Sequence, residues 1–433
     1  MNTRAKEKNF VIAAVANKNG EIFDLDGYAA VGMAGSFLTP LTLDDAMNMP
    51  YGGELMLMPD RKPMVYNIRR QRLEILKENP YRPGEPIFPV AAFNSPGYVI
   101  SFISAYKEQK NAGFLPLFSY GAVGWHKSKF RSAVIRVDKE RRQDLRLMKP
   151  EDVVEGIRKI QKEMPNNRLE THLEKCAMEY GCPAAKNFFL GRYEAPLPTS
   201  PHCNARCLGC LSLQKSSEIP HSQDRIAFKP TSKEIAEVAL FHIRRVRHSV
   251  VSFGQGCEGD PLLAADVIGP AIKDIRSKTS RGTINMNTNG SRPDILKKLF
   301  EAGLDSIRIS LNSFRRSCYD AYFRPNGYEF DDVIKSIETA LIKRKFVSVN
   351  YLNCPGFTDT PEEFNALSEF IRVHPINMIQ WRNLNFDPKR YWNIMSAVVN
   401  PEKSIGIHRI IGQIKEYFPN VKHGYFNPPK EKF

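Results

Sequence analysis

The stretch Cys203-Asn204-Ala205-Arg206-Cys207-Leu208-Gly209-Cys210 places three cysteines at the spacing CxxxCxxC. Pro201 and His202 come directly before it, so a loop is predicted here. Three thiolates at this spacing can bind three irons of an iron–sulfur cube and leave the fourth iron without a protein ligand. A structural zinc site takes four protein ligands, so zinc would need a further donor such as His202 or a distant cysteine.

The chain has 433 residues, more than a single hydrophobic core usually supports, so two domains are expected. Its 62 lysines and arginines against 47 aspartates and glutamates give a formal net charge of +15. That charge suits a polyanion such as RNA or a phosphorylated substrate, and a solvated basic surface is an equally good explanation. The hydrophobic content of 42% is that of a globular protein.

The eight cysteines do not resemble a disulfide framework, because the chain is long and three of them are clustered. The start at residues 1–8 is polar, and the apolar run at residues 10–16 is too short for a signal peptide or a membrane span. No other apolar run approaches the roughly eighteen residues that a spanning helix needs. We therefore expect a protein of the reducing cytoplasm with no membrane partner.

The N-terminal part, residues 1–190, is predicted to be a β-rich (α+β) domain that serves as an accessory or substrate domain. Residues 10–16 have the pattern of a buried strand, Asn17-Lys18-Asn19-Gly20 is a hairpin turn, and residues 21–25 pair back. Apolar residues recur at helical spacing over residues 151–164, which predicts a helix that leads into the next domain.

A basic hairpin is also predicted in this part. Strands at residues 121–125 and 132–137 bracket the segment His126-Lys127-Ser128-Lys129-Phe130-Arg131. With Trp125 and Phe130 among the cations, such a hairpin could follow a nucleic-acid backbone and stack a base. The alternative is a charged hairpin whose aromatic side chains pack inward.

Residues 191–395 alternate between predicted strands and helices. The strands are expected at residues 192–199, 249–254, 283–287, 306–311, 346–352 and 378–382. Helices are expected at residues 231–244, where Thr231 and Glu234 are set as a capping box, and at residues 264–278. Further helices are expected from an N-cap at Ser291 to an end at Gly303, at residues 331–343 and from Thr360 onward. Six βα units in a row indicate a parallel sheet. Residues 396–433 are expected to be a tail with one amphipathic helix at residues 405–418.

The three-cysteine loop after the first strand of such a run resembles that of the radical S-adenosylmethionine (radical SAM) superfamily. The resemblance implies a partial (β/α)6 barrel, also called a partial TIM barrel, a 4Fe-4S cluster on Cys203, Cys207 and Cys210, and S-adenosylmethionine on the open iron. It implies reductive cleavage of that cofactor to a 5′-deoxyadenosyl radical, with electrons from a protein such as flavodoxin or ferredoxin. One departure is Gly209, because the superfamily usually has an aromatic residue there to pack on the adenine.

The resemblance also implies which residues hold S-adenosylmethionine. The segment GQGCEGDP at residues 254–261 resembles the superfamily's glycine-glycine-glutamate segment, which makes Gly256 and Glu258 candidates. Asn289 lies in a Thr-Asn-Gly element after the third strand, although Asn289-Gly290 alone is an ordinary turn. Ser310 and Asn312 on the fourth strand match positions that often contact the ribose or the carboxylate.

Gln380 and Arg382 alternate with Ile379 and Trp381 on the sixth strand, so one of the two pairs faces the barrel interior. Polar side chains inside a barrel need partners. A bound S-adenosylmethionine or substrate would supply them, and Gln380 and Arg382 are therefore added to the candidates.

Cys176 and Cys182 lie shortly before the three-cysteine loop, where Gly181 and Pro183 are expected to end a helix. Many members of the superfamily carry a second iron–sulfur cluster, and these two cysteines with one or two distant ones are candidates for it. The alternative is that both are buried as small apolar side chains.

The sequence thus predicts a radical SAM enzyme that abstracts hydrogen from a substrate. RNA is one candidate substrate, because of the net charge and the basic hairpin. A small metabolite or a peptide is another. A third hypothesis is a non-catalytic zinc-binding adaptor for nucleic acids.

Overall fold

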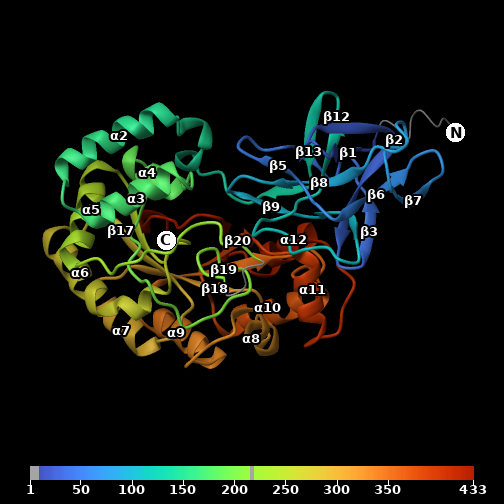
Figure 1. Cartoon of the computed structure of the whole chain (residues 1–433). Coiled ribbons are helices and arrows are strands. Elements are labelled where there is room, and N and C mark those ends of the chain that lie inside the picture. The colour runs from blue at the N-terminus through green and yellow to red at the C-terminus, as the bar shows by residue number, and fades with distance from the viewer. Residues whose placement is uncertain (1–8, 215–218) are drawn as a thin grey trace. The chain divides into compact units, whose positions relative to one another are not determined.

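The computed structural model describes residues 9–214 and 219–433, so the polar start at residues 1–8 lies outside it (Figure 1). The chain divides into two compact units that interleave along the sequence. The first unit contains the chain up to Asp138 together with Leu352–Leu367 and Trp381–Tyr417. The second contains Lys139–Tyr351, Ser368–Gln380 and Phe418–Phe433. Within the described ranges, no helix is both long enough and apolar enough to span a membrane.

The first unit is built mainly from antiparallel strands (Figure 1). They are β1 (Ile12–Asn17), β2 (Ile22–Ala34), β3 (Phe37–Pro40), β4 (Met47–Asn48), β5 (Glu54–Leu57), β6 (Arg61–Asn67), β7 (Arg72–Ile75), β8 (Ile87–Phe93), β9 (Tyr98–Ile100), β10 (Ile103–Ser104), β11 (Tyr106–Glu108), β12 (Val123–His126), β13 (Lys129–Ser132) and β14 (Val134–Arg136). The predicted first hairpin is confirmed, with Gly20 in the left-handed region at φ +82°. The predicted β-rich character of this part is confirmed.

The basic hairpin differs from the prediction in its second strand. β12 pairs with β13, so Lys127 and Ser128 alone form the tip, whereas β14 pairs with β9. The Trp125 ring meets the Phe130 ring edge-on with centroids 4.5 Å apart, and Phe130 packs against buried core side chains. The prediction that residues 132–137 form the second strand of this hairpin is therefore wrong, because strand alternation does not specify a partner.

A buried ion pair fastens a late chain segment to the strands of the first unit. The Arg61 side chain on β6 is 1% exposed, and its Nη2 donates to Asp387 Oδ2 at 3.0 Å and to Glu108 Oε1 at 2.8 Å. Asp387 caps α11 (Pro388–Ser396), which is followed by α12 (Ile407–Tyr417). This segment belongs to the first unit although it comes after most of the second in sequence.

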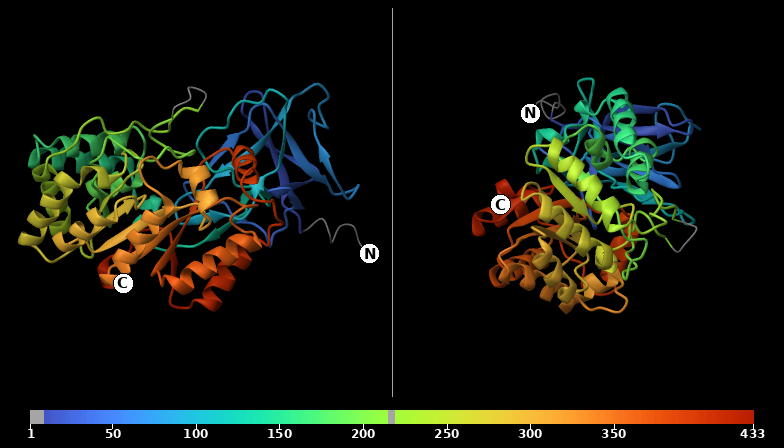
Figure 2. Two further views of the ribbon diagram at one scale, coloured as in Figure 1. Left: turned by 90° about the horizontal axis from the view of Figure 1, so that it is seen from below. Right: turned by 90° about the vertical axis from the view of Figure 1, so that its left-hand side faces the viewer.

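Among the described residues, a seven-stranded sheet, most of it in the second unit, follows chain order from β15 to β21. Its strands are β15 (Glu194–Pro196), β16 (Val250–Phe253), β17 (Thr283–Thr288), β18 (Ser306–Leu311), β19 (Phe346–Asn353), β20 (Met378–Asn383) and β21 (Lys422–Gly424). Figure 2 shows the ribbon of the chain from two further sides. The helices are α2 (Pro150–Glu163), α3 (Arg168–Met178), α4 (Pro183–Phe189), α5 (Ser232–Arg245), α6 (Ala265–Lys278), α7 (Pro293–Ala302), α8 (Arg316–Phe323), α9 (Phe330–Ile342) and α10 (Pro361–Val373), which straddles the two units.

The parallel sheet confirms the predicted partial (β/α)6 barrel. Parallel pairing is explicit in the register, for example Val250 opposite Thr283 and Ser306 opposite Phe346. β16 and β17 are buried along their whole length, as expected for strands covered on both faces. β21 was not predicted, and it adds a short seventh strand beside β20.

The predicted helix ends are confirmed in two places and wrong in one. Thr231 and Glu234 form the capping box of α5, and Gly303 ends α7 at φ +118°. Ser291 is not the N-cap of α7. The N-cap is Arg292, without a side-chain cap bond, while the Ser291 N–H donates to Asn289 Oδ1 at 3.0 Å.

His242 on the buried face of α5 makes stability depend on pH. The side chain is 1% exposed, and Nε2 lies 3.3 Å from the Tyr193 carbonyl oxygen. Burial lowers the pKa of His242 to about 4, although the hydrogen bond with Tyr193 acts against this shift. The unfolded chain takes up this proton near pH 6.5, so its contribution to stability is complete above that pH and decreases toward pH 4.

We expect the free energy of unfolding to fall by about 2 kcal/mol between pH 8 and pH 5 through this side chain. A His242→Leu variant should show a correspondingly smaller decrease over the same interval, because it has no proton to take up there. Urea unfolding of the apo chain at the two pH values measures both decreases. Equal decreases in wild type and variant would contradict the prediction.

Candidate functional site

The three cysteines lie in a loop between β15 and α5, here called the cysteine loop (residues 201–210). Backbone bonds attach this loop to the end of α8: the Arg206 N–H donates to the Phe323 carbonyl at 2.9 Å, and the Leu208 N–H to the Tyr322 carbonyl at 3.0 Å. The Leu208 side chain is buried in this contact region. The loop is thus held in shape by main-chain bonds that leave the thiols free to act as ligands.

All three thiols are partly buried, and Cys203 and Cys210 lie close enough for their charges to affect the pKa of Cys207. Burial raises the pKa of Cys203 to about 12 and that of Cys207 well above its usual value, and the neighbouring thiols raise the latter further. One cation is close, because Arg225 Nη2 lies 3.4 Å from Cys210 Sγ. A metal centre binds cysteine as thiolate, and the charge of the metal favours that form. The donor set therefore fits a thiolate-ligated metal group.

Glu258 joins the cysteine loop to the loop after β16, here called the Glu258 loop (residues 254–261). Its Oε2 accepts the N–H groups of Thr199 and Ser200 at 2.7 and 2.9 Å, and its Oε1 those of Gly254 and Gln255 at 2.7 and 2.8 Å. Burial raises the pKa of Glu258 to about 7, while these four donors oppose the shift because they bind the ionised form. A carboxylate has about four lone-pair sites, so the main chain occupies its acceptor capacity.

Gly259 allows the two loops to approach closely. A Cβ at this position would collide with the His202 carbonyl oxygen. The Gly259 N–H donates to the Ser200 carbonyl at 2.6 Å, and the Asp260 N–H to the His202 carbonyl at 2.9 Å. The start of the cysteine loop therefore lies directly against the Glu258 loop.

Asp260 is a site residue that the sequence reasoning missed. Its carboxylate is 5% exposed and accepts the Thr288 hydroxyl at 2.9 Å and the Asn289 N–H at 2.7 Å. Burial raises its pKa, and its charge in turn adds to the rise in the pKa of Cys203. The sequence feature that could have identified Asp260 is its place as an acidic residue directly before Pro261 in the same glycine-rich segment.

Asn289 lies beside the cysteine loop, as its candidate role requires. Its Nδ2 donates to Asn204 Oδ1 at 2.8 Å, and its side chain is 6% exposed. The Asn204 carbonyl also accepts the Asn326 N–H at 2.9 Å. Asn289 is thus positioned to support the loop between Cys203 and Cys207.

The sheet interior carries the other candidates. Ser310 Oγ accepts a bond from Asn350 Nδ2 at 3.3 Å, and Asn350 Oδ1 is a buried oxygen without a hydrogen-bond partner among the described residues. An acceptor in that position fits a bound polar group. Asn312 Nδ2 instead donates to the Cys318 carbonyl at 3.0 Å, at the start of α8.

Gln380 takes part in a buried polar network with the C-terminal tail. Its Oε1 accepts Arg308 Nη1 at 3.2 Å, and its Nε2 donates to Asn427 Oδ1 at 3.0 Å. Asn427 Nδ2 continues to Glu194 Oε1 at 2.9 Å. Ile379 and Trp381 are fully buried, as Gln380 is. No sequence signal singled out Asn427, because its partners are all distant in the chain.

Two candidates are not brought into these contacts. Gly256 is exposed, and a Cβ there would meet the Gln223 side chain. Arg382 continues β20 into the residues that belong to the first unit. The geometry therefore groups Cys203, Cys207, Cys210, Glu258 and Asn289 closely and adds Asp260 to them.

In a comparison with known protein families, one family model matches the segment that contains this site. The family model described as "Radical SAM superfamily" matches residues 197–371. That segment begins with the last residues before the cysteine loop and ends within α10. It contains the three cysteines, Glu258, Asp260 and Asn289.

The curated relatives are GTP 3′,8-cyclases. The protein of Chlorobaculum tepidum is 25% identical over 222 residues, which cover 51% of this chain and 60% of the relative. The mitochondrial protein of Arabidopsis thaliana is 25% identical over 228 residues, which cover 52% of this chain and 53% of the relative. The match thus spans little more than half the length of either relative.

Solved structures with detectable likeness are remote. Methylornithine synthase has a TM-score of 0.38 at 15% identity, covering 56% of this chain and 68% of that one. SuiB of Streptococcus suis bound to its precursor peptide has a TM-score of 0.37 at 12% identity, covering 71% of this chain and 70% of that one.

Proposed function

We propose that this chain, which belongs to the radical SAM superfamily, cleaves S-adenosylmethionine reductively at the cysteine loop and abstracts hydrogen from a small anionic substrate. The observation that carries the proposal is the three-thiol loop at the carboxyl ends of a parallel sheet. Glu258 binds Thr199 and Ser200 directly before this loop, and the Asp260 N–H donates to the His202 carbonyl at its start. Ligands of such sheets bind at that edge. Members of the superfamily need an external reductant, and flavodoxin or ferredoxin is the proposed donor.

Cys203, Cys207 and Cys210 are the proposed ligands of a 4Fe-4S cluster. When bound, the cluster supplies one electron to S-adenosylmethionine, and methionine and 5′-deoxyadenosine result once a hydrogen atom is taken from the substrate. Glu258, Asp260 and Asn289 keep the cysteine loop against the sheet through the bonds described above. Apart from Glu258, the contacts to S-adenosylmethionine are those proposed from the sequence: Gly256, Asn289, Ser310, Asn312, Gln380 and Arg382.

The structure modifies the proposed role of Glu258. Four backbone N–H groups already use its acceptor positions, so we assign it to positioning the two loops rather than to binding the cofactor's ammonium group directly. Asn350 Oδ1, beside Ser310, is a buried acceptor that lacks a partner within the described chain. It is therefore proposed as an additional contact for a polar group of cofactor or substrate.

GTP is the first substrate to test, because the curated relatives are named GTP 3′,8-cyclases. Arg308 in the sheet interior and the net charge of +15 are compatible with a phosphorylated substrate. The basic hairpin gives less support to RNA, because Phe130 packs against the core and Trp125 packs edge-on against Phe130. A salt-dependent affinity for bulk tRNA or rRNA would revive the RNA hypothesis.

The test is anaerobic reconstitution of the full chain, followed by incubation with S-adenosylmethionine, a reductant and GTP. We expect 5′-deoxyadenosine in stoichiometric excess over enzyme, and GTP should increase its rate several-fold while being consumed. 5′-Deoxyadenosine without any effect of GTP would reject GTP and retain the radical chemistry. No 5′-deoxyadenosine with GTP, with RNA or with a cell extract would reject the proposed function itself.

A further inference from the structure

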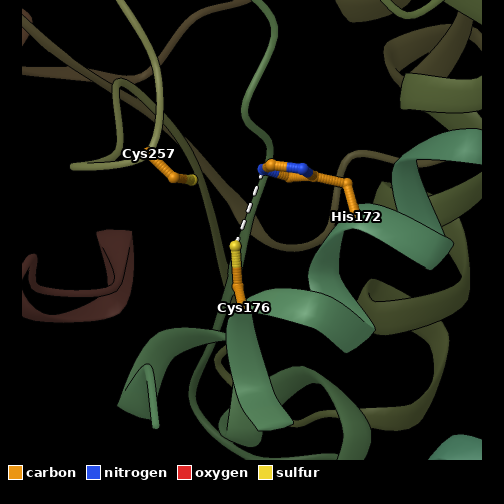
Figure 3. A group of neighbouring side chains, drawn as sticks. All are labelled: His172, Cys176 and Cys257. Atoms are coloured by element: carbon orange, nitrogen blue, oxygen red, sulfur yellow. Dashed lines mark hydrogen bonds between the residues drawn. The ribbon is translucent and has the colours of Figure 1, made fainter. Parts of the chain in front are cut away.

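Three metal-binding side chains meet outside the cysteine loop. His172 and Cys176 lie one turn apart on α3 and therefore share a helix face, and Cys257 comes from the Glu258 loop (Figure 3). Their donor atoms all lie within 4.8 Å of one another. Cys176 and Cys257 are 2% and 5% exposed, and His172 is partly buried. Burial as small apolar groups accounts for each cysteine alone, but not for three donors from two elements that face one another.

The spacing of the donors suits a single ion. Typical Zn–S and Zn–N bonds in a tetrahedron separate a sulfur and a nitrogen by about 3.6 Å, and two sulfurs by about 3.8 Å. His172 Nε2 lies 3.6 Å from Cys176 Sγ. In an iron–sulfur cube each thiolate binds a different iron, so the protein sulfurs stand farther apart than donors that share one ion. The geometry thus favours one ion over a cluster.

We propose that His172, Cys176 and Cys257 bind one divalent ion of the zinc class, with water in the fourth position. Imidazole and thiolate are the ligands that zinc prefers, and three protein donors with one open position are a recognised zinc arrangement. No fourth histidine, cysteine or acidic donor joins the group within residues 9–214 and 219–433. In particular, Cys182 is not a member of it, so this site differs from a second cluster on Cys176 and Cys182.

The electrostatics of the three side chains agree with a bound cation. The hydrogen bond from Cys257 lowers the pKa of Cys176 against the effect of burial, and His172 acts in the same direction. The same contact and burial raise the pKa of Cys257. Both thiols must ionise to bind a divalent ion, and the charge of the ion would favour their ionised forms.

The position of the site suggests what the ion does. Cys257 directly precedes Glu258, whose carboxylate holds the start of the cysteine loop. The Cys257 carbonyl also accepts the Ile226 N–H at 2.7 Å. An ion here would fasten α3 to the loop that positions the cluster ligands, so it belongs to the support of the catalytic site and takes no part in the chemistry.

The experiment uses a full-length chain in which Cys203, Cys207 and Cys210 are alanine, so that Co²⁺ or Zn²⁺ cannot bind the cysteine loop. We expect this chain to bind one Co²⁺, with the intense visible bands of tetrahedral cobalt and a thiolate charge-transfer band. A further Cys176→Ser or His172→Ala change should lower the affinity for Co²⁺ at least tenfold. A further Cys354→Ala change, at a buried cysteine of the first unit, should leave it unchanged.

Two results would overturn the proposal. One is a background chain that keeps the far-UV circular dichroism of the wild type but binds no Co²⁺ or Zn²⁺. The other is unchanged Co²⁺ affinity in both Cys176→Ser and His172→Ala. As a check that does not depend on the alanine background, the wild type with its cluster reconstituted should contain one zinc per chain that the His172→Ala variant lacks. None of these readouts requires cleavage of S-adenosylmethionine, so failure here is separate from failure of the proposed function.

Discussion

A chain in which Cys203, Cys207 and Cys210 are all alanine will bind no iron–sulfur cluster and will form no 5′-deoxyadenosine. The three thiols are the proposed ligands of three irons, and loss of all three removes every protein bond to the cluster. Activity should fall to the background of the assay, because the electron that breaks the carbon–sulfur bond reaches S-adenosylmethionine through the cluster. Iron and sulfide per chain after anaerobic reconstitution, and 5′-deoxyadenosine by chromatography, measure the two losses.

The matched control is Cys354→Ala, which removes a buried cysteine of the first unit and should retain full iron and activity. If the triple variant keeps about half of the iron, a second iron–sulfur cluster exists, and Cys176 and Cys182 become its candidate ligands. Zinc in place of iron in the reconstituted wild type would contradict the radical chemistry and support the zinc adaptor hypothesis. One zinc per chain in addition to iron is what the site at His172 predicts.

Glu258→Gln is expected to have the next largest effect, and it should act on the fold of the site. The amide that replaces one carboxylate oxygen cannot accept hydrogen bonds, so two of the four N–H groups would lose their acceptor. At about 1–3 kcal/mol for each buried unsatisfied donor, the free energy of unfolding should fall by about 3 kcal/mol. Cluster occupancy should fall as well, because Thr199 and Ser200 lead directly into the cysteine loop. Urea unfolding of the apo chain and iron per reconstituted chain measure these effects.

The control is Glu301→Gln, which changes a glutamate that should contribute little to stability. Its side chain is 56% exposed and pairs with Lys343 at the surface, so the change should leave the free energy of unfolding nearly unchanged. A Glu258→Gln variant with wild-type stability and iron content, but with weaker binding of S-adenosylmethionine, would contradict the positioning role. That outcome would indicate that Glu258 contacts the cofactor directly, as the sequence resemblance implied.

Local sequence patterns were sufficient for five strands of the parallel sheet, β16 to β20. The first strand, β15 (Glu194–Pro196), is shorter than the predicted residues 192–199. β18 (Ser306–Leu311) occupies the predicted residues, and β16, β17, β19 and β20 differ from their predicted bounds by one or two residues. These strands are short apolar runs bounded by turn residues, so their signal is contained within a few neighbouring positions. The capping box at Thr231 and the glycine end of α7 are local in the same sense.

Features that depend on a distant partner were missed or assigned incorrectly. β14 pairs with β9 rather than with β12, and the three-residue β21 is a strand only because β20 lies beside it. Asn427 reaches Gln380 and Glu194 from the C-terminal tail. In each case the neighbouring sequence permits several partners, and the free energy of burying polar groups selects the one that satisfies their hydrogen bonds.

The sequence by itself predicted the three-thiol loop proposed to hold the cluster, and the parallel α/β architecture, because both follow from residue spacing over a few positions. Only the tertiary structure decided that the Glu258 carboxylate is saturated by four backbone donors, that Asp260 supports Asn289, and that His172 and Cys176 face Cys257. Those facts depend on which segments meet after folding. An unfolded chain can bring many different pairs of segments into contact. Only the packing of the complete core makes one set of these contacts the most stable.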